Sequence, residues 1–65
     1  MSDFIGRRKL RESRIKKNYT QYYVAEAVGI SRNFYNQVEK GKRNPRLDTA
    51  FKISDLLEVD VNEWR

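Results

Sequence analysis

Apolar residues recur along this chain at spacings of three and four positions rather than in alternation, a pattern typical of amphipathic helices and not of strands. The first predicted helix runs from about Asp3 to Lys17 and carries Leu10 and Arg14 on one face. No repeat, linker or low-complexity stretch interrupts the sequence. We therefore expect residues 1–65 to form a single all-α domain, a compact bundle of about five short helices.

Two further helices are predicted on either side of Gly29. Thr20 is expected to cap the second helix, because its hydroxyl can accept from an amide hydrogen of the first turn. Gly29 follows the last apolar position of that helix, where glycine adopts a left-handed conformation without steric cost. Ser31 is expected to cap a third helix, roughly Ser31 to Lys40, which stops at Gly41. The side chains expected between these two helices are Val24, Ala25, Val28, Ile30, Tyr35 and Val38.

A fourth helix is predicted from Leu47 to Leu57, after a basic loop that ends at Arg46. Its expected core stripe consists of Leu47, Ala50, Ile53, Leu56 and Leu57. Val59 and Val61 then lead into a last turn that brings Trp64 back onto the core.

Two short helices joined by a three-residue turn that contains glycine form a helix-turn-helix. The crossing of such helices needs a small side chain, and Ala25 supplies it. In these features the chain resembles the phage-repressor and Cro type of helix-turn-helix family, also called Xre-like, which implies a lambda-repressor-like fold. The resemblance covers nearly the whole chain and is carried by Thr20-Gln21, Val24-Ala25, Gly29 to Ser31, Val38-Glu39 with Gly41, Gly41 to Pro45, Leu47 to Ile53, and Val59 to Trp64.

Three positions depart from the family pattern. Tyr22 and Tyr23 stand where acidic or small polar residues are usual, Tyr35 replaces isoleucine or leucine, and Ser13 replaces a larger apolar residue. These departures affect packing and surface contacts rather than the expected fold.

The net charge of +5 is unevenly distributed along the chain. Residues 1–18 carry seven basic and two acidic side chains, and residues 32–46 carry five basic and one acidic. Residues 47–65 carry two basic and five acidic side chains, so the last third is acidic. This asymmetry is equally compatible with a polyanionic partner and with a solvated basic surface.

The third predicted helix leaves four polar side chains on its outer face, and these have the chemistry that reads base edges: Arg32, Asn33, Asn36 and Gln37. Amides pair bidentately with adenine, and arginine pairs with guanine. The resemblance implies that a second set contacts DNA phosphates: Gln21, Lys42, Arg43, Asn44 and Arg46. It also implies an internal ion pair between Arg14 and Glu39. Phe34 is expected to pack beside the second helix rather than to touch a thymine methyl.

The basic run of the first helix allows two interpretations. Its side chains either reach neighbouring phosphates or only attract DNA at long range: Arg7, Arg8, Lys9 and Arg11.

Several classes of function are disfavoured by composition. The chain has no cysteine and no histidine, which removes disulfides, thiol nucleophiles, imidazole bases and most transition-metal sites. Nothing in the pattern brings two carboxylates together in a cleft, so we expect no enzyme, cofactor, metal or small-molecule ligand. No apolar run approaches the roughly 20 residues of a membrane span, and no signal peptide is recognisable, so a cytoplasmic protein is expected.

The resulting hypothesis is a transcriptional regulator, more specifically a repressor, that binds a two-fold symmetric double-stranded DNA operator as a homodimer. Dimer contacts are expected at the C-terminal end: Leu57, Val59, Val61 and Trp64. The alternative is an adaptor or antitoxin of the same fold that binds a protein partner through Tyr22 and Tyr23.

Overall fold

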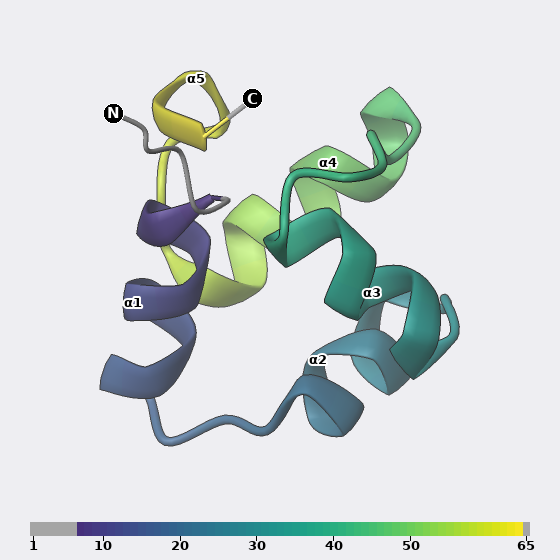
Figure 1. Ribbon diagram of the computed structural model, residues 1–65. Helices are drawn as coiled ribbons and strands as arrows, with labels where there is room; N and C mark the ends of the chain where they lie inside the picture. The colour runs from purple at the N-terminus through teal and green to yellow at the C-terminus, as the bar shows by residue number, and fades with distance from the viewer. Residues whose placement is uncertain (1–6, 65) are drawn as a thin grey trace.

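The computed structural model describes residues 7–64 and contains, within that range, five α-helices and no strand. In chain order they are α1 (Arg8–Lys16), α2 (Gln21–Val28), α3 (Arg32–Glu39), α4 (Leu47–Leu57) and α5 (Val61–Trp64). Helices α2 and α3 pack together on one side of the molecule, α1 and α5 pack together on the other, and α4 contacts both pairs (Figure 1). The predicted all-α bundle is confirmed. Of the helices described, none is long and apolar enough to cross a membrane.

Local capping defines the helix-turn-helix. The Thr20 hydroxyl accepts from the Tyr23 N–H at 3.0 Å, and the Ser31 hydroxyl accepts from the Phe34 N–H at 3.0 Å. Gly29 ends α2 in the left-handed conformation, with φ 81° and ψ 32°. The predicted starts of α2 and α3 and the turn between them are therefore confirmed.

The first helix is shorter than its sequence pattern indicates. Arg7 has non-helical angles, φ −91° and ψ 82°, so helix does not run continuously from Asp3 to Lys17 as expected. Helix α1 begins at Arg8 and ends at Lys16, and Asn18 leaves the helical path with φ 62°. The predicted portion from Asp3 to residue 6 lies outside the described residues.

A single hydrophobic core joins all five helices. Its most buried apolar members are Leu10, Val24, Ala25, Val28, Tyr35, Val38, Ala50, Ile53, Leu57 and Trp64. Phe34 packs against this core, as expected. The placement of Leu47 in the core stripe was wrong, since Leu47 is 56% exposed. It begins α4 and shares an outer face with Phe51 one turn later, whereas Ala50 and Ile53 face inward.

Candidate nucleic-acid interface

The outer face of α3 presents four polar side chains together. Arg32 and Asn33 are exposed in its first turn, and Asn36 and Gln37 are half-buried in the second. At 3.6 residues per turn these four positions span an arc of about 140° around the helix axis. Tyr35, Val38 and Glu39 lie outside this arc and are buried. The structure thus brings together all four residues predicted to read bases.

Close packing onto α2 supports this face of α3. Helix α2 contacts α3, and Ala25 of α2 is 1% exposed in the core. The hydroxyl of Ser31 satisfies an amide at the start of α3. The cap and the packing together hold α3 against α2.

The loop after α3 folds back over the end of that helix. The backbone N–H groups of Lys42 and Arg43 both donate to the Gln37 carbonyl, at 2.9 and 3.3 Å. Gly41 permits this reversal with φ 76°, and Pro45, within the loop, is buried. The side chains predicted to contact phosphates remain exposed: Lys42, Arg43, Asn44 and Arg46. The backbone bonds to Gln37 thus hold the exposed basic loop against the C-terminal end of α3.

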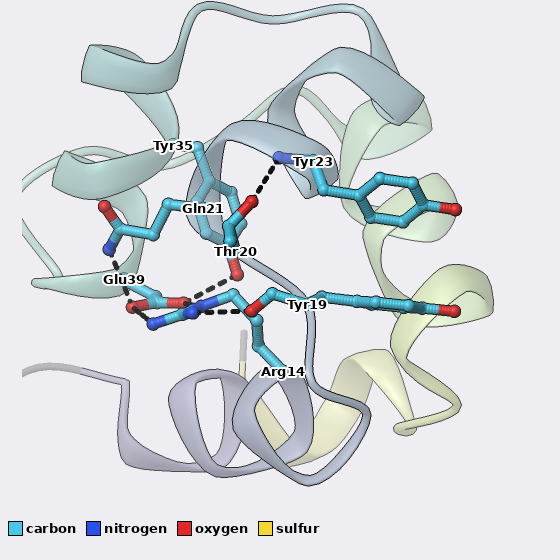
Figure 2. Close-up of polar contacts among 7 residues, drawn as sticks. All are labelled: Arg14, Tyr19, Thr20, Gln21, Tyr23, Tyr35 and Glu39. Atoms are coloured by element: carbon cyan, nitrogen blue, oxygen red, sulfur yellow. Dashed lines mark hydrogen bonds and ion pairs between the residues drawn. The ribbon is translucent and has the colours of Figure 1, made fainter.

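A buried carboxylate, Glu39, connects α1, α2 and α3 behind this surface (Figure 2). Arg14 Nε donates to Glu39 Oε2 at 2.6 Å, which forms the ion pair that the family resemblance implied. The Tyr35 hydroxyl donates to the same oxygen at 2.8 Å, and Gln21 Nε2 donates to Oε1 at 3.0 Å. Arg14 Nη1 also donates to the Tyr19 carbonyl at 2.9 Å. Three side chains from three helices therefore compensate one buried negative charge.

Tyr35 is a departure from the family pattern that the structure explains. Its ring fills a fully buried core position, while its hydroxyl supplies a donor to Glu39. Burial, followed by the nearby negative charge of Glu39, raises the pKa of Tyr35 above its usual value. The hydrogen bond to Glu39 likewise raises the pKa of Arg14. The tyrosine therefore stays protonated and the arginine stays charged.

Gln21 occupies a position between this network and the surface at the start of α2. One Nε2 hydrogen is directed to Glu39, and a primary amide has a second hydrogen for another acceptor. Glu39 thereby fixes the orientation of the Gln21 amide. Its contact with a DNA phosphate remains a prediction.

The side chains expected to form a dimer contact are largely buried within the monomer. Leu57 is 2% and Trp64 7% exposed, and Trp64 Nε1 donates to the buried Ser54 hydroxyl at 2.8 Å. Val59 and Val61 are half-buried against the same core. These four side chains leave little apolar surface for a second chain.

Among the basic residues near the start of α1, Arg7 differs from its neighbours. Arg8 and Lys9 are exposed and lie 4.0 Å from Glu12 and 3.8 Å from Glu63, respectively. The Arg7 guanidinium instead turns inward, toward α5 and the loop after α3. No signal in the sequence distinguishes this arginine from Arg8.

The tyrosines of α2 lie away from the Glu39 network. Tyr22 is 60% and Tyr23 is 48% exposed. The Tyr23 ring stacks obliquely on Tyr19, with centroids 4.6 Å apart, and both rings point away from Glu39 in Figure 2. Tyr19 and Tyr23 thus form an aromatic pair at the start of α2, and Tyr22 is exposed next to it in sequence.

Residues 10–64 match the sequence pattern of the helix-turn-helix family. The transcriptional repressor RstR of a cryptic CTXphi phage in Vibrio cholerae is 33% identical over 55 residues, which cover 85% of this chain and 50% of RstR. An uncharacterized HTH-type transcriptional regulator of Methanocaldococcus jannaschii is 38% identical over 55 residues, covering 85% of this chain and 83% of that protein. The chain thus spans about half the length of RstR.

Two solved structures share this arrangement of helices. The restriction-modification controller protein C.AhdI from Aeromonas hydrophila matches with a TM-score of 0.77 and 31% identity, over 89% of this chain and 88% of C.AhdI. The structure of SinR, a master regulator for biofilm formation, was solved in complex with DNA. It matches with a TM-score of 0.73 and 25% identity, over 85% of this chain and 89% of the SinR chain.

Proposed function

The chain belongs to the helix-turn-helix family, and from this premise we propose that it is a sequence-specific, DNA-binding transcriptional regulator that acts as a repressor in the cytoplasm. The observation that carries the proposal is the outer face of α3, where Arg32, Asn33, Asn36 and Gln37 lie together beside an exposed basic loop. RstR, a relative, is named a repressor, and SinR was crystallised with DNA.

In this mechanism α3 lies in the major groove. Arg32 reads guanine, and Asn33 and Gln37 read adenine through their amides. The loop from Lys42 to Arg46 and the amide of Gln21 bind flanking phosphates, which fixes the register of α3 without reading sequence. A chain bound in this way represses transcription by covering a DNA site that RNA polymerase needs.

We propose further that two chains bind one operator. A single short helix reads only a few base pairs, and two-fold dimers place two such helices about one helical turn of DNA apart. The C-terminal side chains are mostly buried in the monomer and offer little apolar surface to a second chain. We therefore expect a weak contact between free chains, and we propose that it tightens on DNA. Sedimentation of the complex tests this: two chains per operator support it, and one chain per operator contradicts it.

Selection of bound duplexes from a random pool tests the proposed function itself. The expected result is enrichment of one sequence with two-fold symmetry, in which each half-site contains adenine and guanine positions suited to α3. A pool that stays random after repeated rounds would contradict sequence-specific binding.

A protein-binding adaptor of the same fold is the second candidate, and the exposed tyrosines at the start of α2 favour it. Substitution of Tyr22 and Tyr23 by alanine distinguishes the two functions. Unchanged operator affinity in that variant is expected if α3 and its loop are the binding surface.

A further inference from the structure

Arg7, the residue before α1, makes more polar contacts than any other side chain of its basic run. Its Nε donates to the Trp64 carbonyl at 3.2 Å, and its Nη1 donates to the carbonyls of Val38 and Arg43, the latter at 3.0 Å. Its Nη2 donates to Asn44 Oδ1, and the guanidinium lies 5.7 Å from the Trp64 ring centroid. The Arg7 backbone N–H also donates to the Glu39 carbonyl at 2.7 Å.

These contacts join three parts of the molecule that are distant in sequence. The carbonyls of Val38 and Glu39 belong to the last turn of α3, and the Val38 carbonyl also accepts from the Gly41 N–H at 3.0 Å. The Arg43 carbonyl and the Asn44 side chain belong to the loop after α3, and Trp64 ends α5. Arg7 therefore links the base-reading helix, the loop beside it and the C-terminal helix at one point.

The contact with Asn44 has a chemical consequence. A guanidinium has donors and no acceptor, so it binds the oxygen end of an amide. The Asn44 Oδ1 is thereby directed to Arg7, and the Nδ2 group with its two hydrogens is directed away from it. Phosphate oxygens are acceptors, so an exposed Asn44 held in this orientation presents donors to an anion.

We propose that Arg7 is a positioning residue for DNA binding, which fixes the loop after α3 and turns the Nδ2 group of Asn44 toward a DNA phosphate. The proposal rests on the proposed function, since it names how one phosphate contact is built. Arg7 itself does not touch DNA in this arrangement. Arg7 contributes to DNA affinity by holding Asn44 and the backbone of the loop in place.

Five variants test the proposal: Arg7→Ala, Arg7→Lys, Asn44→Ala, the double variant of both alanines, and Lys52→Ala as a charge-matched control on α4. Loss of one charge-assisted contact predicts about tenfold weaker operator binding for Arg7→Ala and for Asn44→Ala. The double variant is expected to bind no more weakly than the poorer single variant, because the two residues act as one unit. Lysine retains the charge but not the forked geometry, so Arg7→Lys is expected to bind like Arg7→Ala. Lys52→Ala is expected to remain within about twofold of the wild type.

A spectroscopic measurement without DNA separates positioning from simple attraction. In the uncomplexed chain, the NMR signals of the Asn44 side-chain amide are expected to shift in Arg7→Ala and Arg7→Lys and to stay unchanged in Lys52→Ala. Asn44→Asp covers the case in which Arg7→Ala does not fold. It keeps a partner for Arg7 but removes the donor, so it is expected to fold normally and to lose operator affinity by tenfold or more.

Three results would overturn the proposal while leaving the proposed function intact: wild-type affinity in Arg7→Lys, multiplicative losses in the double variant, or unchanged affinity in Asn44→Asp. If the wild-type chain binds no duplex at all, the proposed function itself is refuted, and the role of Arg7 in DNA binding with it.

Discussion

Replacement of Arg14 by alanine tests the buried network that holds the three helices of the DNA-binding unit together. The Arg14 and Glu39 side chains are only 12% and 5% exposed, so the variant leaves a carboxylate in the core with two neutral donors, Tyr35 and Gln21. Breaking a buried ion pair in this way costs about 3–5 kcal/mol. The Tyr19 carbonyl loses its donor as well.

This loss is large compared with the stability of so small a domain. At about 0.05–0.15 kcal/mol per residue, a chain of 65 residues is expected to unfold with a free energy of about 3–10 kcal/mol. Arg14→Ala should therefore remove between a third and all of that free energy. Urea unfolding followed by far-UV circular dichroism measures it, with Arg11→Ala, an exposed arginine of the same helix, as the matched control.

A second substitution identifies the cause of the loss. Adding Glu39→Gln to Arg14→Ala removes the unpaired charge, so the double variant is expected to be more stable than Arg14→Ala alone. The reasoning would be refuted if Arg14→Ala were within about 0.5 kcal/mol of Arg11→Ala, the range of ordinary surface substitutions. It would also be refuted if Glu39→Gln made the arginine variant less stable.

Two further predictions concern stability. Tyr35→Phe removes the hydroxyl donor to Glu39 and should cost about 1.5–3 kcal/mol near neutral pH, measured by urea unfolding. Burial raises the pKa of Tyr35, so the stability that its hydroxyl contributes is complete below the unfolded pKa of about 10 and declines as pH rises above that value. The difference in unfolding free energy between wild type and Tyr35→Phe should therefore shrink at high pH. A difference that stays constant with pH would contradict this. Gly29→Ala should lower the unfolding free energy by about 1–2 kcal/mol because of the left-handed φ of 81° alone, since nothing packs within 4 Å of the added Cβ. Thermal melts should show a smaller loss of stability for Gly29→Asn. Equal stability of Gly29→Ala and wild type would exclude strain at this turn.

The sequence predicted those elements whose signals are local. Thr20, Ser31 and Gly29 determine where α2 and α3 begin and end through bonds and angles within a few residues. The start of α1 was misplaced because its apolar positions are scattered. Leu47 was misplaced because an apolar residue at the end of a helix can fall on either side of the core stripe.

Features that depend on packing between distant segments were harder to predict from the sequence. The family resemblance implied the pairing of Arg14 with Glu39, but the contributions of Tyr35 and Gln21 follow only from the crossing of three helices. The contacts of Arg7 require α5 and the loop after α3 to meet, which no spacing in the sequence reveals. Leu57 and Trp64 were predicted both as core residues and as dimer contacts; their burial confirms the first prediction, and the dimer contact stays a prediction.

The central claim is that the outer face of α3 reads base sequence while the loop after it binds phosphates. Affinity for a selected operator and for a scrambled duplex, each at several salt concentrations, tests this claim with Arg32→Ala, Gln37→Ala, Arg43→Ala and Arg46→Ala. The α3 variants should lose about 1–3 kcal/mol of discrimination between the two duplexes. The loop variants should weaken binding to both duplexes alike and reduce the logarithmic salt slope by about one. If Gln37→Ala lowers both affinities equally, or if none of the four folded variants changes DNA affinity, the account is contradicted.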